Sequence, residues 1–368
     1  MAYIWQHSDW PNFTWSADLV QDTIYRYAME ASALIGHVAH LSDENKNDAL
    51  IDIMVSEAIK TSQIEGEDLN RDDVHSSICN QLGLNIPPKR VSDPRANGAA
   101  QLMVAVQQSF EKELDEGLLF AWHDMLISEP MQRERLEVGR WRTSTQPMQI
   151  VSGYVGREKV HYEAPPSADV KAQMDAMIKW FNESAGLQAP IRSAIAHLYF
   201  ESIHPFSDGN GRIGRAISEL ALSQELKHPV LLSLSTTIQA KRNEYYDELS
   251  KASSGSCDIT DWIVWFTKLV LDAQLQAKGQ LNFVLAKARF WDVHGESLSA
   301  RQSTIISRML QEGRDGFEGG MSAQKYMKMT DCSKATATRD LTDLCQKGCM
   351  TKSEEGGRST RYDVNLNE

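Results

Sequence analysis

Residues 204–215 read His204-Pro-Phe-Ser-Asp-Gly-Asn-Gly-Arg-Ile-Gly-Arg215. Apolar residues recur at helical spacing before this segment, over 193–202, and again after its start, over 213–222. The spacing therefore predicts two helices joined by a short turn, with residues 208–211 leading into the second helix. A basic side chain, a carboxylate, a glycine-rich turn and two arginines meet here, a combination that few purely structural turns need.

The glycines of this turn predict a site for an anion. Glycine allows positive φ and close backbone approach, and the start of a helix presents unpaired N–H groups and the positive end of the helix dipole. Arg212 and Arg215 are three residues apart, so they project to the same side of the helix. Because their planar forks suit successive phosphates, we expect a polyphosphate ligand.

Two further side chains of the turn predict chemistry on that ligand. Asp208 offers a hard carboxylate oxygen, and Mg²⁺ commonly joins one or two carboxylates to substrate phosphates. His204 offers an imidazole, which titrates near neutral pH and can take a proton from an attacking hydroxyl. We therefore expect a metal ligand at Asp208 and a general base at His204.

The segment resembles the signature of Fic (filamentation induced by cAMP) domain proteins, His-x-Phe-x-(Asp/Glu)-Gly-Asn-Gly-Arg-x-x-Arg, at all eight of its defined positions. The resemblance implies the following roles: general base for His204, Mg²⁺ ligand for Asp208, anion hole for Gly209, Asn210 and Gly211, and binding of the ATP phosphates for Arg212 and Arg215. It also implies a mainly α fold with a Fic-type helical core. The implied reaction is attack by a protein hydroxyl on the α-phosphate of ATP, with AMP retained on the target and pyrophosphate released.

A related branch of the family, the death-on-curing proteins, phosphorylates its targets instead. That branch carries Lys where this chain has Gly211, and it lacks the second arginine found here as Arg215. The sequence therefore favours AMP transfer.

A second segment, Thr61-Ser-Gln-Ile-Glu65-Gly66, ends a predicted helix over 47–64. It is similar to the inhibitory motif (Ser/Thr)-x-x-x-Glu-(Gly/Asn) that precedes the catalytic core of many Fic proteins. By that resemblance Glu65 pairs with Arg215 and blocks the productive pose of the γ-phosphate. The alternative is a solvated helix end with no regulatory role.

Residues 149–163 carry β-branched and aromatic side chains around Gly153 and Gly156, which predicts a β-hairpin. Fic proteins have a flap at this place that pins a target segment by strand-like pairing, so the resemblance implies a protein partner with a Tyr, Ser or Thr hydroxyl, or modification of the chain itself. The alternative is an ordinary edge hairpin.

Asn243 and Tyr246 follow the signature at the place where the family binds adenosine, and an aromatic ring could stack on adenine. The alternative for each is packing within the helical core.

Composition is compatible with a globular enzyme. The chain has 368 residues and a formal net charge of −12, with 42% hydrophobic residues. The first residues lack a basic start followed by an apolar run, and no run of about eighteen apolar residues occurs, so we expect a cytoplasmic protein with no membrane partner.

Composition shifts predict three domains: an N-terminal helical module over 1–90 that contains the inhibitory helix, a Fic core over 91–285, and a C-terminal domain over 286–368. The aromatic-rich beginning of the first module, 3–15, is expected to pack against the core.

The C-terminal domain resembles a winged helix-turn-helix over 321–364, with Arg358 and Arg361 on its wing. Residues 286–368 hold 13 Lys and Arg against 12 Asp and Glu, a net charge of only +1, which is a poor electrostatic match for DNA. DNA binding and protein docking both stay open.

Three functions remain. The first is a protein adenylyltransferase that is autoinhibited through Glu65. The second is a bifunctional or mainly AMP-removing Fic enzyme, in which Glu65 orients a water molecule. The third is a DNA-binding regulator with the Fic core as a sensor.

Overall fold

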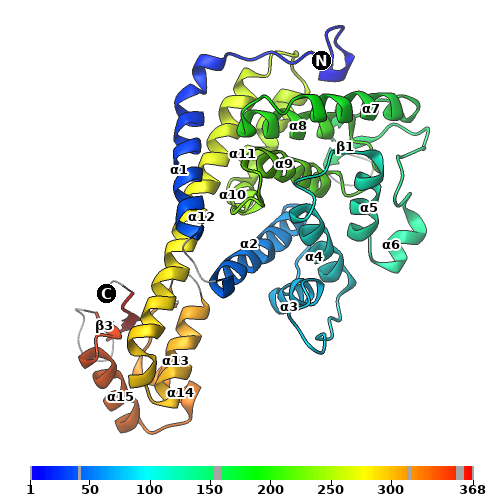
Figure 1. Cartoon of the computed structure of the whole chain (residues 1–368). Helices are drawn as coiled ribbons and strands as arrows, with labels where there is room; N and C mark the ends of the chain where they lie inside the picture. Colours follow the sequence, from blue (N-terminus) through cyan, green and yellow to red (C-terminus); the bar gives the residue numbers. More distant parts are fainter. Residues whose placement is uncertain are drawn as a thin grey trace. The chain divides into compact units, whose positions relative to one another are not determined.

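A computed structural model of the chain describes residues 2–39, 43–152, 159–312, 316–317, 319–353 and 360–366. These residues lie mostly in helices, and two antiparallel strand pairs complete the fold, so the expected mainly α class is confirmed (Figure 1). The helices are α1 (Gln21–Ala39), α2 (Asp43–Ile64), α3 (Arg71–Gln81), α4 (Pro94–Gln107), α5 (Glu116–Leu126), α6 (Pro130–Arg135), α7 (Ser167–Glu183), α8 (Ala189–Ile203), α9 (Asn210–Leu226), α10 (Leu234–Ala240), α11 (Arg242–Ser253), α12 (Thr260–His294), α13 (Ala300–Gln311), α14 (Ala323–Thr330) and α15 (Lys334–Gln346). The strands are β1 (Gln149–Ser152), β2 (Lys159–Glu163), β3 (Met350–Lys352) and β4 (Tyr362–Val364).

The chain divides into two compact units, residues 1–39 with 50–275 and residues 40–49 with 276–368. The domain boundaries expected after residues 90 and 285 stay predictions.

Helices α8 and α9 share the most extensive helix contact of the larger unit. Every residue of α8 is buried, and some of its polar groups bond to the neighbouring helix: Ser193 Oγ donates to the carbonyl of Ser218 at 3.0 Å. The two helices approach closely because residue 214 is glycine. A Cβ at Gly214 would lie 2.7 Å from Oε1 of Glu201 and 3.3 Å from Nδ1 of His197. This approach sets the position of the turn between the helices.

The aromatic N-terminal segment packs against this core, as expected. Trp10 and Phe13 both meet the ring of Tyr199 edge-on, with centroid distances of 5.0 and 5.4 Å. The indole N–H of Trp5 donates to the carbonyl of Glu163 at 2.8 Å, which ties the segment to β2 as well.

Strands β1 and β2 pair antiparallel, with Gln149 opposite Glu163 and a bulge between Ile150 and Val151. The two strands of the hairpin expected over 149–163 are thus present. Its turn, with Gly153 and Gly156, lies outside the described residues.

The smaller unit contains α13, α14, α15 and the pair β3–β4 around a buried apolar cluster. Asp340 on α15 joins that helix to α13 and α14, because it accepts from Arg301 Nε at 2.7 Å and from the hydroxyl of Tyr326 at 2.9 Å. The identification of 321–364 as a winged helix-turn-helix stays a prediction, and Arg358 lies outside the described residues.

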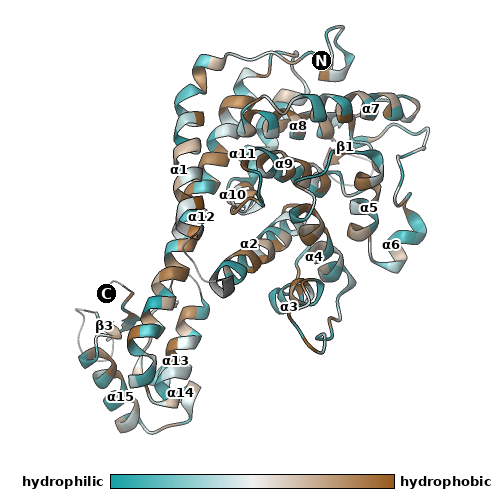
Figure 2. Cartoon of the chain, viewed as in Figure 1, coloured by the Kyte–Doolittle hydropathy of each residue, from teal (hydrophilic) through white to brown (hydrophobic). Residues whose placement is uncertain are grey.

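The helices differ in hydropathy. Figure 2 shows hydrophobic residues on α8 and α9, whereas α6 is mostly hydrophilic. Within the described ranges, none of the helices combines the length and apolar character that a membrane span needs.

We predict that Gly214→Ala destabilises the protein by about 1–3 kcal/mol, because the added methyl overlaps buried polar atoms of α8. Gly36→Ala on α1 is the control: nothing lies within 4 Å of the Cβ position there, so the substitution is expected to be neutral or stabilising by up to about 1 kcal/mol. Urea unfolding of both variants measures the difference. Equal stabilities would contradict the close approach at residue 214.

Candidate functional site

His204 ends helix α8 in the left-handed conformation, with φ 50° and ψ 59°, while its N–H still donates to the carbonyl of Phe200 at 2.9 Å. This backbone conformation costs a residue with a Cβ about 1–2 kcal/mol. The buried guanidinium of Arg142 holds it, since Nε donates to the His204 carbonyl at 2.8 Å and Nη2 to the Pro165 carbonyl at 2.5 Å. The Arg142 N–H also donates to the carbonyl of Pro205 at 2.9 Å. These hydrogen bonds fix the backbone of His204 and Pro205, and with it the point from which the imidazole projects.

The turn after His204 is closed by the side chain of Asn210. Its Oδ1 accepts from the Phe206 N–H at 2.9 Å, and its Nδ2 donates to the Phe206 carbonyl at 2.8 Å. The Asn210 side chain is therefore used inside the turn, and what it offers an anion is its backbone N–H at the start of α9.

His123 supports the same turn from α5. Its ring stacks on Phe206 with a centroid distance of 4.0 Å and an interplanar angle of 5°. Nδ1 accepts from the Gly139 N–H at 3.0 Å, so Nε2 carries the proton and donates to the carbonyl of Asp208 at 3.1 Å. Burial lowers the pKa of His123, which keeps the ring neutral.

Asp208 is half-exposed, and its Oδ1 accepts from the Gly209 N–H at 2.6 Å. Gly209 has φ 80°, which favours glycine. In the described parts of the chain, no three His, Cys, Asp or Glu side chains group into a metal site. A metal at Asp208 would therefore need oxygens from a second molecule, as Mg²⁺ takes them from phosphates.

The two arginines of α9 are both buried and both paired with carboxylates that follow α2. Arg215 is 1% exposed and donates through Nη2 to Glu65 Oε1 at 2.8 Å, and through Nε to the hydroxyl of Thr61 at 2.7 Å. Arg212 donates through Nη1 to Glu67 Oε2 at 2.9 Å. Burial lowers the pKa of Arg215, but the charge and hydrogen bond of Glu65, together with Tyr245 and Glu201, outweigh burial and raise that pKa above its usual range.

Glu65 also lies against the start of α9. A Cβ at Gly211 would overlap its Oε1. Glu65 therefore places a negative charge at the glycine turn, where the sequence predicts an anion.

The end of α2 is fixed from α11. The last carbonyl of α2, on Ile64, accepts from Arg242 Nη2 at 2.7 Å and from the hydroxyl of Tyr246 at 3.2 Å. Gly66 follows with φ 84°, as expected for a helix stop. Tyr246 thus lies beside the end of α2.

The middle of α2 carries a buried carboxylate. Glu57 accepts from the Ser235 N–H at 2.9 Å, at the start of α10, and from the hydroxyl of Ser233 at 2.7 Å. Glu219 on α9 accepts from Gln107 Nε2 at 2.8 Å. Burial, and next the charge of Glu57, raises the pKa of Glu219 well above its ordinary value.

The structure brings most of the predicted residues together. His204, residues 208–212, Arg215 and Glu65 lie around the start of α9, and Tyr246 joins them through Ile64. Asn243 is exposed on α11. Its predicted role stays a prediction.

Sequence reasoning missed several residues of the site. Glu67 is signalled only by being acidic two residues after Glu65, and Arg142 only by the run Gly139-Arg-Trp-Arg142. No sequence pattern marks His123 or Glu201. His123 bonds to the backbone carbonyl of Asp208, and Glu201 lies beside the His204 side chain.

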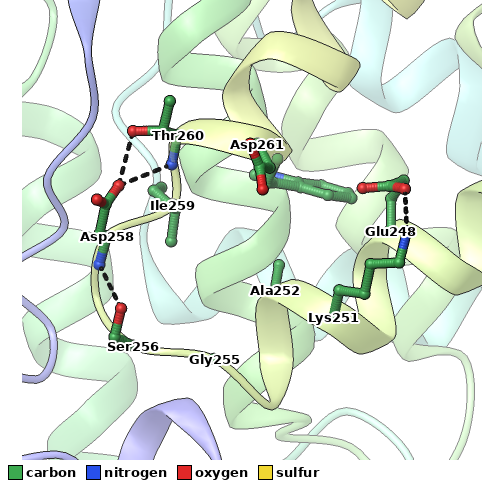
Figure 3. Close-up of a pocket in the computed structure, with 10 residues that line it drawn as sticks. Glu248, Lys251, Ala252, Gly255, Ser256, Asp258, Ile259, Thr260 and Asp261 are labelled. Carbon is green, nitrogen blue, oxygen red and sulfur yellow. Dashed lines mark hydrogen bonds and ion pairs between the residues drawn. The ribbon is translucent and has the colours of Figure 1, made fainter.

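A separate pocket of about 320 Å³ lies between the end of α11 and the start of α12 (Figure 3). Its polar side chains bond to one another: Lys251 Nζ donates to Glu248 at 2.7 Å, and Asp258 accepts from the Thr260 hydroxyl at 2.6 Å. None of its lining residues belongs to the motif.

Comparison with known families agrees with this site. The Fic/DOC family model matches residues 113–222, so the expected Fic domain is confirmed. A domain of unknown function, DUF4172, matches residues 3–84. The solved structure of a Fic family protein from Desulfovibrio desulfuricans G20 superposes with a TM-score of 0.56 at 23% identity, over 96% of this chain and 98% of that one, which shows a shared fold.

Two curated relatives are similar over part of the chain. Protein adenylyltransferase fic-1 of Caenorhabditis briggsae is 40% identical over 152 residues, 40% of this chain and 28% of the relative. Protein adenylyltransferase Fic of Culex quinquefasciatus is 33% identical over 123 residues, 32% of this chain and 23% of the relative. The chain thus spans about a quarter of the length of these relatives.

We predict that the stability of the protein falls as pH rises above the ordinary titration range of glutamate. The folded state keeps a proton on Glu219 that the unfolded chain has lost, so stability drops by up to about 1.4 kcal/mol per pH unit until the folded-state carboxyl ionises. Glu219→Gln removes this slope, whereas Glu183→Gln on the exposed end of α7 keeps it. Urea unfolding between pH 5 and pH 8 measures it. If the free energy of unfolding of Glu219→Gln still falls with pH at the wild-type rate, another group causes the pH dependence.

Proposed function

Starting from the Fic/DOC domain over 113–222, we propose that this chain is a protein adenylyltransferase that is autoinhibited by the segment after α2. The observation that carries the proposal is the grouping of His204, Asp208, Arg212 and Arg215 around the glycine turn at the start of α9. The names of the curated relatives support the reaction type.

The proposed chemistry uses each group for one task. Backbone N–H groups at the start of α9 and the two guanidinium groups bind the triphosphate and orient its α-phosphate. His204 takes the proton of a Tyr, Ser or Thr hydroxyl while that oxygen bonds to the α-phosphorus. The bond to pyrophosphate breaks, and AMP stays on the target. Positioning and charge stabilisation supply most of the acceleration in such transfers.

Mg²⁺ fits this site together with ATP. Asp208 supplies one half-exposed carboxylate at the edge of the turn, which suits an ion that takes its remaining ligands from phosphates and water. When bound, the ion would neutralise charge on the phosphates.

Autoinhibition follows from competition between anions. The carboxylates of Glu65 and Glu67 occupy the two guanidinium groups that would bind phosphates, and Glu65 also lies against Gly211. A triphosphate cannot bind both arginines productively while the carboxylates hold them, so the resting chain has low activity. The alternative, in which Glu65 orients a water to remove AMP, uses the same residues.

The β1–β2 flap is the proposed dock for the target segment, and the chain itself is a second possible target. Ile150, Val151 and Val160 of the flap are exposed, which suits pairing with an extended peptide. For the winged helix proposed over 321–364, the low net charge of the C-terminal domain favours a protein partner over DNA.

We predict that Glu65→Gly raises incorporation of AMP by roughly tenfold or more, the factor that about 1.4 kcal/mol of competition supplies. His204→Ala in the same background abolishes incorporation because no base remains. Labelled ATP with Mg²⁺, followed by gel autoradiography and mass spectrometry of extract proteins, measures both. Asp68→Ala, an exposed carboxylate of the same turn, is the control. No gain from Glu65→Gly would remove the autoinhibition claim.

A second prediction concerns Glu67. Glu67→Gln frees Arg212 for phosphate and tightens ATP binding by about two- to fivefold, the worth of a partly exposed ion pair. Titration calorimetry with ATP and Mg²⁺ measures the affinity, with Asp68→Ala again as control. If ATP binds Glu67→Gln and wild type equally, Glu67 has no part in inhibition.

A further inference from the structure

The histidine of the motif faces a buried carboxylate from its own helix. Nδ1 of His204 lies 3.6 Å from Oε2 of Glu201, one helical turn earlier, and the two side chains are 13% and 6% exposed. The distance is slightly longer than a hydrogen bond, and both groups are held in place by α8.

In the described part of the chain, neither of two polar atoms of this pair has a hydrogen-bond partner. Oε1 of Glu201 and Nδ1 of His204 are buried without a hydrogen-bond partner there. Burial raises the pKa of Glu201, but His204, His197 and Arg215 outweigh burial and hold that pKa below its ordinary value. The carboxylate is therefore charged at neutral pH, and a charge in this position needs the imidazole as its counterpart.

The surroundings fix Glu201 in this position. Gly214 on α9 leaves the space that Oε1 occupies. His197 lies one turn earlier on α8, and its Nε2 is 2.8 Å from the hydroxyl of Tyr245 on α11.

Further groups face the pair from other elements. Arg215 faces it from α9 but is neutralised by Glu65. The Tyr162 hydroxyl on β2 donates to the Ser202 carbonyl, and Arg142 donates to the His204 carbonyl. Both bond to the backbone, so neither competes for the imidazole. Glu201 is the carboxylate that acts on the ring.

We propose that Glu201 is a positioning residue for the general base: it keeps a proton on Nδ1 of His204 and thereby leaves the lone pair of Nε2 for the target hydroxyl. The inference rests on the proposed function. As the hydroxyl oxygen bonds to the α-phosphorus and pyrophosphate leaves, the hydroxyl proton moves to Nε2, and the Glu201 carboxylate stabilises the imidazolium that results. Glu201 itself neither gains nor loses a proton.

The test is Glu201→Gln and Glu201→Asp in the Glu65→Gly background. The amide keeps the size of the side chain but removes its charge, so kcat is expected to fall by about 10- to 100-fold while the KM for ATP stays within about twofold. Without the nearby negative charge the imidazolium is less stable, so the acid limb of the pH–rate profile moves to lower pH. Glu201→Asp restores part of kcat and returns the limb toward its original position.

The controls separate this inference from the proposed function. Glu225→Gln changes a carboxylate that bonds the other end of α8, at the Ala189 N–H, and is expected to leave kcat and the pH profile unchanged. An inactive Glu65→Gly protein would sink the proposed function. If the Glu65→Gly protein is active, two results would overturn the role of Glu201. In the first, Glu201→Gln lowers kcat but leaves the acid limb of the pH–rate profile in place; in the second, Glu201→Gln leaves kcat unchanged.

A readout without activity completes the test. Nitrogen-15 NMR of the histidine rings, with the His204 signal assigned by its loss in His204→Ala, is expected to show the proton on Nδ1 in wild type and a mixture of tautomers in Glu201→Gln. A proton on Nε2 in wild type would overturn the inference even if the enzyme is active.

Discussion

A guanidinium that is almost completely removed from water must have a negative partner, and Arg215 is in that position. In the resting chain the partner is Glu65, supported by the hydroxyl and carbonyl of Thr61. Loss of Glu65 would leave this buried charge without its partner, so the requirement joins α2 to α9. Under the proposed function, α2 does not leave unless another anion arrives, so phosphate binding and the release of Glu65 are linked in both directions.

The turn at the start of α9 is rigid for a different reason. Arg142, His123 and Asn210 all bind its backbone rather than a ligand, and they come from three separate places in the chain. A left-handed histidine needs such support, since its backbone conformation is unfavourable by itself. Residues that look like surface or core in the sequence therefore decide where the imidazole points.

The sequence was sufficient for the two helices around 204–215, for the stop at Gly66 and for the closeness of Glu65 to Arg215, because each follows from local periodicity or from a motif. It could not predict His123 or Arg142, which act through backbone carbonyls that no pattern marks. The assignment of Asn210 to the anion hole stays a prediction that now concerns its backbone N–H, because the side-chain amide bonds within the turn. Long-range contacts such as that of Tyr246 with Ile64 depend on how helices pack, and residue spacing does not encode that.

Gly211 has a consequence of its own. The carboxylate of Glu65 fills the volume that a methyl group at this position would need. Under the proposed function, a side chain at 211 would displace the Glu65 carboxylate and change where the phosphates lie. Under the proposed function, substitutions that free the two arginines without altering the glycine turn therefore belong in α2 or in the residues that follow it, where Glu65 and Glu67 lie.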